Sequence, residues 1–578
     1  MRLVWIAFLA LLASMAQASR IILIPLDNRP AAGQFAQMIA DIDGAQVVMP
    51  PYNLLGRFTS AGNPEAILQW LSSQDMSDVS SVIVSADMIA YGGLIASRLP
   101  DVPESLAISR LQQLQSIAQR IRPKTRVFVF TSVMRLAPTA TVASRPWRAQ
   151  LAKYVAARES LQNPKNPTLI AMKAKVPPVQ LERYDAARKR DHNVQLALIK
   201  MNQFSFDYLV VGQDDAQIHG PHIPETRELV SLTKQLGEDG KVYFCEGVDQ
   251  NADILVSRSL LKAANWSPKI RVVYSDPYGR TKVGAYESKS VQQTVSDQVY
   301  ASGARIAGFN EPYDYTLYVN TPARRELFFK DFMDDLRNEM DQDLPVCLAD
   351  INLAADGTCD REMFETLRKE SRLMKLLAFA GWNTAGNTLG TAIPSANVTL
   401  LAERTKYDPV KLQIAQKRFL LHRIVDDVMY HRWTRPKAYA LIDSLPDGAR
   451  EETYGDSYTV LTDYVRKDLS SLLGQTFNSQ LKGLKFSSEV QSYQFTGLDN
   501  IRVFLPWPRA YEVRVEFGLN VAALPQPGQT TPVQKPGQAH SLVTDFALAV
   551  GSLIVGGAAL IATWWRPQDN KRRVSLFA

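Results

Sequence analysis

Cysteine is scarce in this sequence, with three residues in a chain of 578. So few cysteines exclude a disulfide-rich scaffold and a zinc domain built on cysteine ligands. Long blocks of like charge are also missing, and part of the formal net charge of +7 lies at the two ends of the chain. A nucleic-acid-binding protein of this size normally carries a basic stripe, so the sequence predicts no nucleic-acid partner.

The common nucleotide-binding and acyl-transfer motifs are missing as well. The chain contains no GxSxG, Walker A or GxGxxG pattern. A serine nucleophile with a histidine base, or a glycine loop that cradles phosphate, therefore has no support from motifs. We predict no cofactor.

The N-terminus has the features of an export signal. Arg2 precedes an apolar run, and Ala16-Gln17-Ala18 forms an A-x-A cleavage site. Residues 1–18 are therefore predicted to be a signal peptide, the alternative being an uncleaved anchor or a buried helix.

The C-terminus carries the longest apolar run, residues 546–565, which is long enough to cross a bilayer at about 1.5 Å per residue. The run contains no charge, ends in two tryptophans and precedes a basic tail, residues 566–578. This pattern predicts a transmembrane helix with a cytoplasmic C-terminus, the alternative being a buried soluble helix. Residues 524–540 are rich in Pro, Gln and Gly and are predicted to be a linker.

Short apolar runs, each followed by polar or glycine-rich residues, recur before residue 405. They lie at residues 21–25, 47–51, 81–87, 126–132, 208–215, 242–247, 270–276, 346–350 and 376–381. The runs are continuous and rich in β-branched residues, as in strands buried on both faces. Helical patterns lie between them, so residues 19–405 are predicted to form an α/β body with a mainly parallel sheet, either doubly wound or barrel-like.

The pattern changes after residue 405. Residues 406–475 are mostly helical and residues 476–523 alternate as short strands. The sequence therefore predicts a helical segment and a small C-terminal β unit. Cys347 and Cys359 flank a short loop, and we expect a disulfide between them, the alternative being two unpaired buried thiols.

Polar clusters follow the predicted strands, and ligands of parallel α/β folds bind beyond the carboxyl ends of strands. The clusters contain Asp27, Asn28 and Arg29; Asp87; Gln213, Asp214 and Asp215; Glu246, Asp249 and Gln250; Asp276; Asn310 and Glu311; Asp350; and Trp382, Asn383 and Asn387. Carboxylates, amides, arginine and tryptophan suit polyhydroxylated substrates, because they bond hydroxyl groups, cover sugar rings and divide acid and base roles.

Some of these residues also have a purely structural interpretation. Asp27 could cap the helix that begins near Pro30, and Asp87 could be a solvated turn carboxylate. The segment 381–390, GWNTAGNTLG, is the most informative, because Trp382 stands beside two Asn-Thr pairs and glycines permit close backbone approach. A turn rich in Asn and Gly is its alternative, and we favour substrate contact.

The chain resembles a bacterial family known as domain-of-unknown-function family 4127, over roughly residues 20–515. The motifs that carry the resemblance are IPLDNRP, SADMIAYGGLIASR, GQDDAQIHG, EGVDQNADILVSR, GWNTAGNTLG, RIVDDVMYHR and LPWPRAYEV. The resemblance implies an exported bacterial protein with one shared site, and it supplies no activity. It also implies Asp-Glu where this chain has Asp249-Gln250, which puts a catalytic role for position 250 in doubt.

We therefore predict an exported hydrolase of envelope or extracellular glycans, anchored in the inner membrane by the C-terminal helix. Asp215 and Asp87 are the expected acid and base or nucleophile, and Asp214 is a further catalytic candidate. The expected substrate-binding residues are Asp27, Asn28, Arg29, Gln213, Asp249, Trp382, Asn383 and Asn387.

Two other functions stay open. A metal-dependent hydrolase would use Asp214, Asp215, His219 and His222, but their spacing matches no metal-site template and we predict no metal ligand. A noncatalytic, tethered glycan- or envelope-binding protein is favoured by Gln250.

Overall fold

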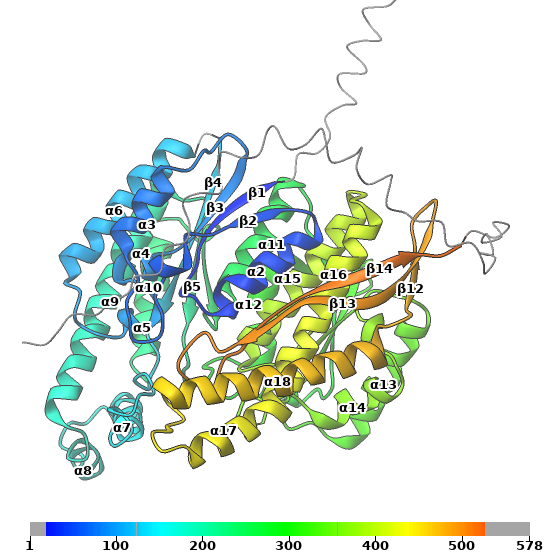
Figure 1. Ribbon diagram of the computed structural model, residues 1–578. Coiled ribbons are helices and arrows are strands. Elements are labelled where there is room, and N and C mark those ends of the chain that lie inside the picture. The colour runs from blue at the N-terminus through cyan, green and yellow to red at the C-terminus, as the bar shows by residue number, and fades with distance from the viewer. Residues whose placement is uncertain (1–18, 123, 355, 526–578) are drawn as a thin grey trace, which may run out of the picture. The chain divides into compact units, whose positions relative to one another are not determined.

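The computed structural model describes residues 19–122, 124–354 and 356–525 (Figure 1). The predicted signal peptide, transmembrane helix and tail, and all but the first two residues of the predicted linker, lie outside these ranges. Within these ranges, no helix is both long and apolar enough to cross a bilayer. The described residues up to Leu524 form one compact unit.

Two open parallel sheets form its framework. The first has the order β2-β1-β3-β4-β5-β6 and the second the order β11-β10-β9-β7-β8. The first sheet contains β1 (Arg20–Ile24), β2 (Gln46–Val48), β3 (Val79–Ser85), β4 (Arg126–Val133), β5 (Tyr208–Gln213) and β6 (Val242–Glu246). The second contains β7 (Lys269–Tyr274), β8 (Arg305–Ile306), β9 (Tyr315–Asn320), β10 (Val346–Asp350) and β11 (Ala378–Ala380). The predicted parallel α/β class is confirmed, with two open sheets in place of a barrel.

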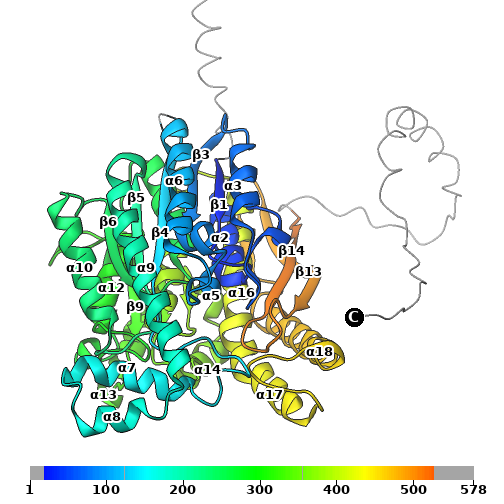
Figure 2. The same ribbon diagram turned by 90° about the vertical axis from the view of Figure 1, so that its left-hand side faces the viewer.

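Helices cover both faces of each sheet (Figures 1 and 2). The layer between the sheets contains α2 (Pro30–Ile42), α11 (Asn251–Ala263), α12 (Val291–Ala301) and α15 (Ala385–Arg404). The outer face of the first sheet is covered by α3 (Pro64–Ser72), α4 (Ala86–Tyr91), α6 (Glu104–Ile121), α9 (Pro178–Ser205) and α10 (His222–Gln235). The outer face of the second packs on α13 (Glu326–Asp341) and α14 (Arg361–Lys369). The helices α5 (Leu94–Ser97), α7 (Arg148–Leu161) and α8 (Pro167–Lys173) also belong to this part.

Burial on both faces explains the continuous apolar runs. Ile21 and Leu23 of β1 pack in the layer between the sheets, whereas Ile22 and Ile24 pack against the outer helices. Successive side chains of a strand point to opposite faces, so a strand covered on both sides needs an apolar residue at every position.

The C-terminal part begins with helices. It contains α16 (Pro409–Arg423), the π-helix η4 (Ile424–Thr434), α17 (Arg435–Ser444) and α18 (Gly455–Gln480). The antiparallel strands β12 (Lys485–Ser487), β13 (Ser492–Phe504) and β14 (Arg514–Ala523) follow. The small C-terminal β unit is thus confirmed. Its strands share a core with η4, α18 and the outer face of the second sheet.

The expected disulfide between Cys347 and Cys359 is wrong, because both residues are buried free thiols, as is Cys245. Cys347 belongs to the core between the two sheets, whereas Cys359 belongs to the core on the outer face of the second sheet. The sheet itself therefore separates the two sulfur atoms, a separation that closeness in sequence does not reveal.

Candidate functional site

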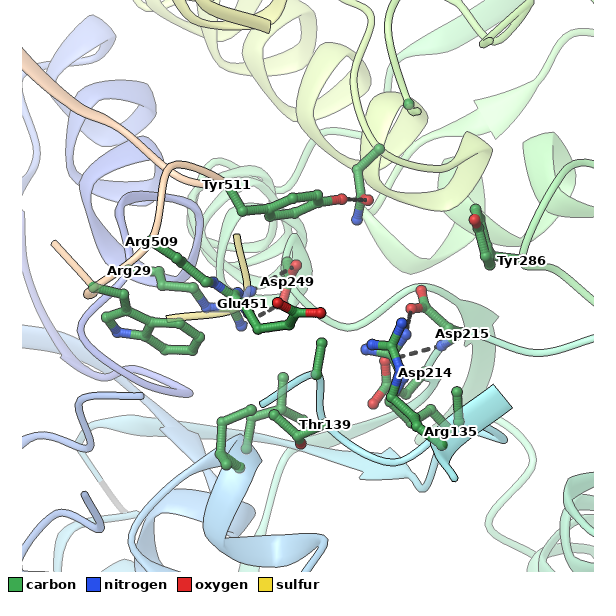
Figure 3. Close-up of a pocket in the computed structure, with 18 of the residues that line it drawn as sticks. Arg29, Arg135, Thr139, Asp214, Asp215, Asp249, Tyr286, Glu451, Arg509 and Tyr511 are labelled. Atoms are coloured by element: carbon green, nitrogen blue, oxygen red, sulfur yellow. Dashed lines mark hydrogen bonds and ion pairs between the residues drawn. The ribbon is translucent and has the colours of Figure 1, made fainter. Parts of the chain in front are cut away.

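A cavity of about 410 Å³ opens at the carboxyl ends of the first sheet (Figure 3). The order in which strands are added to this sheet reverses at β1, since β2 lies on one side of β1 and β3 on the other, and the segments after β1 and β3 both reach the cavity. Open parallel sheets bind their ligands at such a switch point. The charged residues that line the cavity are Arg29, Arg98, Arg135, Arg148, Asp214, Asp215, Asp249, Asp356, Arg450, Glu451 and Arg509.

Arg29 joins two carboxylates at one side of the cavity. Its Nη2 lies 2.7 Å from Asp27 Oδ2 and 2.7 Å from Asp249 Oδ1. Burial lowers the pKa of Arg29, but the charges of Asp249 and Asp27 outweigh burial and raise it well above its ordinary value. Asp27 does not cap α2. Arg29 is the residue immediately before that helix, and its side chain donates a hydrogen bond to Asp27. This bridge fixes the position of the Asp249 side chain at the cavity wall.

Asp214 and Asp215 form the opposite side and have different electrostatic surroundings. Asp214 accepts a hydrogen bond from Arg98 at 2.5 Å, and Asp215 is paired with Arg135. Burial raises the pKa of both carboxyls, but the charges of Arg98 and Arg135 outweigh it at Asp214, whose pKa is lowered. At Asp215 burial dominates and raises the pKa, with contributions from Asp214 and Asp249. Adjacent carboxyls whose pKa values are pushed apart can divide acid and base roles.

The connection between β13 and β14 supplies an aromatic wall (Figure 3). Trp507 Nε1 donates to Asn28 Oδ1 at 2.7 Å, and its ring lies 4.8 Å from the Arg29 guanidinium. Tyr511 also lines the cavity, with the Arg509 guanidinium 5.4 Å from its ring. Aromatic faces next to ion pairs give a surface for the apolar side of a sugar ring.

A chain of amides ties the second sheet to this site. Tyr511 donates to Asn383 Oδ1 at 2.6 Å, and Asn383 Nδ2 donates to Asn387 Oδ1 at 2.7 Å. Asn387 Nδ2 then donates to Gln250 Oε1 at 2.7 Å. Gln250 is fully buried, so position 250 holds the loop after β6 against α15 and does not face the cavity.

The glycines of segment 381–390 serve this close packing. A Cβ at Gly390 would lie 2.1 Å from Gln250 Cγ, and one at Gly386 would lie 2.5 Å from the carbonyl oxygen of Glu246. The close approach that these glycines permit is therefore between α15 and the loop after β6. Within segment 381–390, Asn383 is the one residue that lines the main cavity and could contact a ligand there.

The structure brings many of the predicted residues together. Arg29, Asp214, Asp215, Asp249 and Asn383 line the cavity, and Gln213 and Asn387 line a small inner extension of it. Asp27 and Asn28 stand behind Arg29 and Trp507 as their partners. Trp382 lines a separate small chamber next to the cavity.

Asp87 stands apart from this group. It is buried on α4 and accepts from Ser132 Oγ at 3.0 Å and Thr131 Oγ1 at 3.4 Å. It is not among the residues that line the cavity. Its interpretation as a solvated turn carboxylate fails as well, because burial and the charge of Asp191 raise its pKa to about 7.

The residues of the metal alternative are not gathered around one point. Within residues 19–122, 124–354 and 356–525, no group of three or more His, Cys, Asp or Glu side chains is arranged to hold a metal ion. Asp214 and Asp215 face arginines, His219 is exposed, and His222 Nε2 bonds the carbonyl of Gln217.

Arg98, Arg135, Trp507 and Tyr511 are the important residues that sequence reasoning missed. Arg98 ends the motif SADMIAYGGLIASR, and Trp507 and Tyr511 lie in LPWPRAYEV. The signal was thus present in the quoted motifs. Arg135 lies two residues after the end of β4, in a segment without carboxylates that was therefore not among the predicted clusters.

A family model described as "Protein of unknown function (DUF4127)" matches residues 21–516. The match covers both sheets, the cavity and most of the C-terminal part. The chain therefore belongs to this family. None of the curated proteins compared with the chain matches it.

Proposed function

We propose that the protein is a hydrolase of glycans that uses paired carboxyl groups for acid and base catalysis. The observation that carries the proposal is one cavity in which two carboxyls with opposite pKa shifts, Asp214 and Asp215, face Asp249 and an aromatic wall. Glycoside hydrolysis needs a protonated carboxyl for the leaving oxygen and an ionised one for the sugar carbon or for water.

Asp215 is the proposed general acid. Its side chain reaches the cavity, and burial raises its pKa above the ordinary value of an aspartic acid, which is the direction that a general acid needs. Asp249 is the proposed partner carboxylate in place of Asp87, because it lines the cavity and its charge already contributes to the raised pKa of Asp215. Arg29 orients the Asp249 side chain through two hydrogen bonds.

The side chains that line the cavity also support binding of a sugar. Arg98, Arg135 and Asn383 present donors and acceptors in fixed positions, and Trp507 and Tyr511 present ring faces. Ion pairs inside the cavity balance much of its charge, which suits a hydroxyl-rich ligand.

The test is release of reducing ends from a panel of bacterial envelope and extracellular polysaccharides by the purified full-length protein. Release by the parent protein and its loss in Asp215→Asn support the proposal. Parallel incubation with a chelator separates it from a metal-dependent hydrolase, because carboxylate chemistry continues without a divalent ion. Absence of release from every glycan on the panel, together with absence of binding, contradicts it.

A noncatalytic glycan-binding protein is the second candidate. Each carboxylate that lines the cavity has an arginine partner: Asp214 with Arg98, Asp215 with Arg135, Asp249 with Arg29, Asp356 with Arg435 and Glu451 with Arg145. Carboxylates held this firmly also suit recognition without turnover. Binding of a glycan by the parent protein without release of reducing ends supports this candidate.

We also propose that the body is exported and anchored to the membrane. The support is the sequence pattern of residues 1–18 and 546–565. Ending the chain after residue 523 is expected to release the protein from the membrane fraction of its host, and retention in that fraction contradicts the anchor.

A further inference from the structure

Arg148 differs from the other arginines that line the main cavity. Each of the others pairs with a carboxyl group: Arg29 with Asp249, Arg98 with Asp214, Arg135 with Asp215, Arg450 with Asp443 and Arg509 with Glu512. Among the residues that the structure describes, none forms a hydrogen bond or ion pair with the Arg148 side chain. A guanidinium group stays charged in proteins, so Arg148 is a cation without a counter-charge.

The guanidinium of Arg148 is open to a ligand. Arg148 is the first residue of α7 and is partly exposed, and none of its side-chain nitrogens is shut off from solvent. The groups that influence its pKa are Arg135, Glu451, Tyr286 and Arg509, and all four line the main cavity (Figure 3). The guanidinium therefore lies among side chains of the cavity wall.

Negative charge is in short supply around Arg148. Burial lowers its pKa and the charge of Arg135 lowers it further, and the opposing effect of Glu451 does not make up for both. Glu451 is itself held by Arg145, whose Nε donates to Glu451 Oε1 at 2.9 Å and whose Nη2 bonds the second oxygen. Glu451 therefore shares its charge with an arginine that does not line the cavity.

The part of the cavity around Arg29 has the reverse imbalance. Asp27 and Asp249 share the one guanidinium of Arg29. A ligand with a negative group is repelled by the additional carboxylate there and attracted by the unpaired cation at Arg148. The uneven distribution of charge therefore orients an acidic ligand within the cavity.

A carboxylate is the negative group that fits Arg148 best. The planar guanidinium forms two parallel hydrogen bonds with a carboxylate. One unpaired guanidinium also matches one negative charge, whereas a phosphate monoester carries about −1.5 to −2 near neutral pH. A neutral sugar hydroxyl accepts a hydrogen bond from Arg148 but leaves its charge uncompensated.

We propose that Arg148 binds the carboxylate of a uronic acid unit, so that the substrate is an acidic glycan. The inference rests on the proposed function, since it names the substrate class of the same site. Arg148 is thus a specificity-determining residue. Arg135 and Arg509 keep their own carboxyl partners and supply the positive surroundings that favour the negative group.

The experiment measures dissociation constants of the full-length protein for methyl glucuronide and methyl glucoside by NMR titration near neutral pH. The two sugars differ in one group, a carboxylate in place of a hydroxymethyl group. We expect the glucuronide to bind at least about tenfold more tightly, the effect of a charge-assisted hydrogen bond. In Arg148→Gln, which keeps a polar side chain and removes the charge, the preference should fall below about twofold.

Arg158→Gln is the matched control. Arg158 belongs to the same helix, α7, and does not line the cavity, so the variant loses one positive charge and keeps Arg148. It should retain the full preference for the glucuronide. The methyl ester of the glucuronide, which has no charge, should bind the parent protein as weakly as the glucoside does. Thermal unfolding of both variants shows whether they fold.

Three results would overturn the role of Arg148. The first is equal binding of the glucuronide and the glucoside by the parent protein. The second is a preference that survives in a folded Arg148→Gln. The third is an equal loss of preference in Arg158→Gln, because the effect would then come from the overall charge of the protein and not from contact.

The same data separate this inference from the proposed function. Release of reducing ends from a neutral glycan, together with equal binding of the two sugars, overturns the role of Arg148 and retains the hydrolase. Binding of the glucuronide that depends on Arg148, without release from any glycan, retains the role of Arg148 and overturns the hydrolase. No release and no binding of either sugar overturns both.

Discussion

The carboxyl ends of the two parallel sheets carry similar residues and differ in what surrounds them. In the first sheet, Asp214 and Asp249 are paired with arginines that come from other segments of the chain. In the second sheet, Asp350 accepts from the backbone N–H of Asp360 at 2.5 Å and from Asn320 Nδ2 at 2.9 Å. The first set lines a cavity, whereas the second fastens its own loops.

Asp276 shows the same local use in the second sheet. It accepts from the backbone N–H of Tyr278 at 2.7 Å and of Arg325 at 2.8 Å, and it pairs with the Arg325 side chain. An acidic residue after a strand is therefore not sufficient to mark a site. Asp276 also has an arginine partner from another segment, so the distinguishing feature is the space in front of the carboxylate.

The largest expected difference between the two edges is in turnover. Asp215→Asn removes the proposed acid, which contributes about 10²–10⁴-fold in general acid catalysis, so release of reducing ends should fall at least about 100-fold. The matched change in the second sheet, Asp350→Asn, should lower turnover less than about threefold. Equal losses in the two variants, both folded by circular dichroism, contradict the distinction between the edges.

The second expected difference between the two sheet edges is in the free energy of unfolding. Arg29→Met leaves Asp27 and Asp249 buried without their partner, and breaking a buried pair of this kind costs about 3–5 kcal/mol. Arg305→Met breaks the pair with Glu311 beside β8, in which both side chains are partly exposed, at 40% and 27%, at a cost of about 0–1 kcal/mol. Urea unfolding of both variants measures the difference. Similar costs would show that the bridge at Arg29 has no special role.

Asp87 sharpens the comparison within the first sheet. Burial and the charge of Asp191 raise its pKa to about 7. Between about pH 4 and 7 the folded protein therefore binds more protons at Asp87 than the unfolded chain, and its contribution to stability falls as pH rises. At Asp87 this effect makes the unfolding free energy fall by up to about 1.4 kcal/mol for each pH unit in this window, and Asp87→Asn should remove that fall.

The same variant should keep turnover within about threefold of the parent, because Asp87 does not line the cavity. Urea unfolding across pH 4 to 8 and the release assay together check both statements. A loss of turnover as severe as that of Asp215→Asn would return Asp87 to the catalytic group.

The smallest expected effect concerns the thiols. Cys347 and Cys359 lie in cores on opposite faces of the second sheet. Adding reductant should leave the midpoint of urea unfolding unchanged, and alkylation after unfolding without reductant should label all three cysteines. A midpoint that falls on reduction would show that a disulfide forms.

Sequence reasoning predicted the parallel α/β class, because strands buried on both faces contain continuous apolar runs and β1 through β7 each contain such a run. It missed β9, whose YTLYVN places threonine and tyrosines among its apolar residues, although the whole strand is buried. Open sheets and a barrel produce the same alternation of strands and helices, so only the pairing of strands could decide between them.

The site was only partly predictable for a related reason. Strand-end position selected Asp214, Asp215 and Asp249 as candidates, and the structure places all three in the lining of one cavity. It could not show that the Asp87 side chain is buried and bonded to Ser132. It also could not show that Trp507, in a hairpin hundreds of residues after Asn28, packs beside Asn28 at the cavity. Those facts depend on how distant segments pack, which no local pattern contains.

The most direct test of the central claim is a crystal structure of Asp215→Asn with a glycan that the protein retains. The account predicts a sugar ring in the cavity of the first sheet, against Trp507 and Tyr511 and within hydrogen-bonding distance of Asp249. A glycan bound instead at the carboxyl edge of the second sheet, beside Asp276 and Asp350, would contradict it.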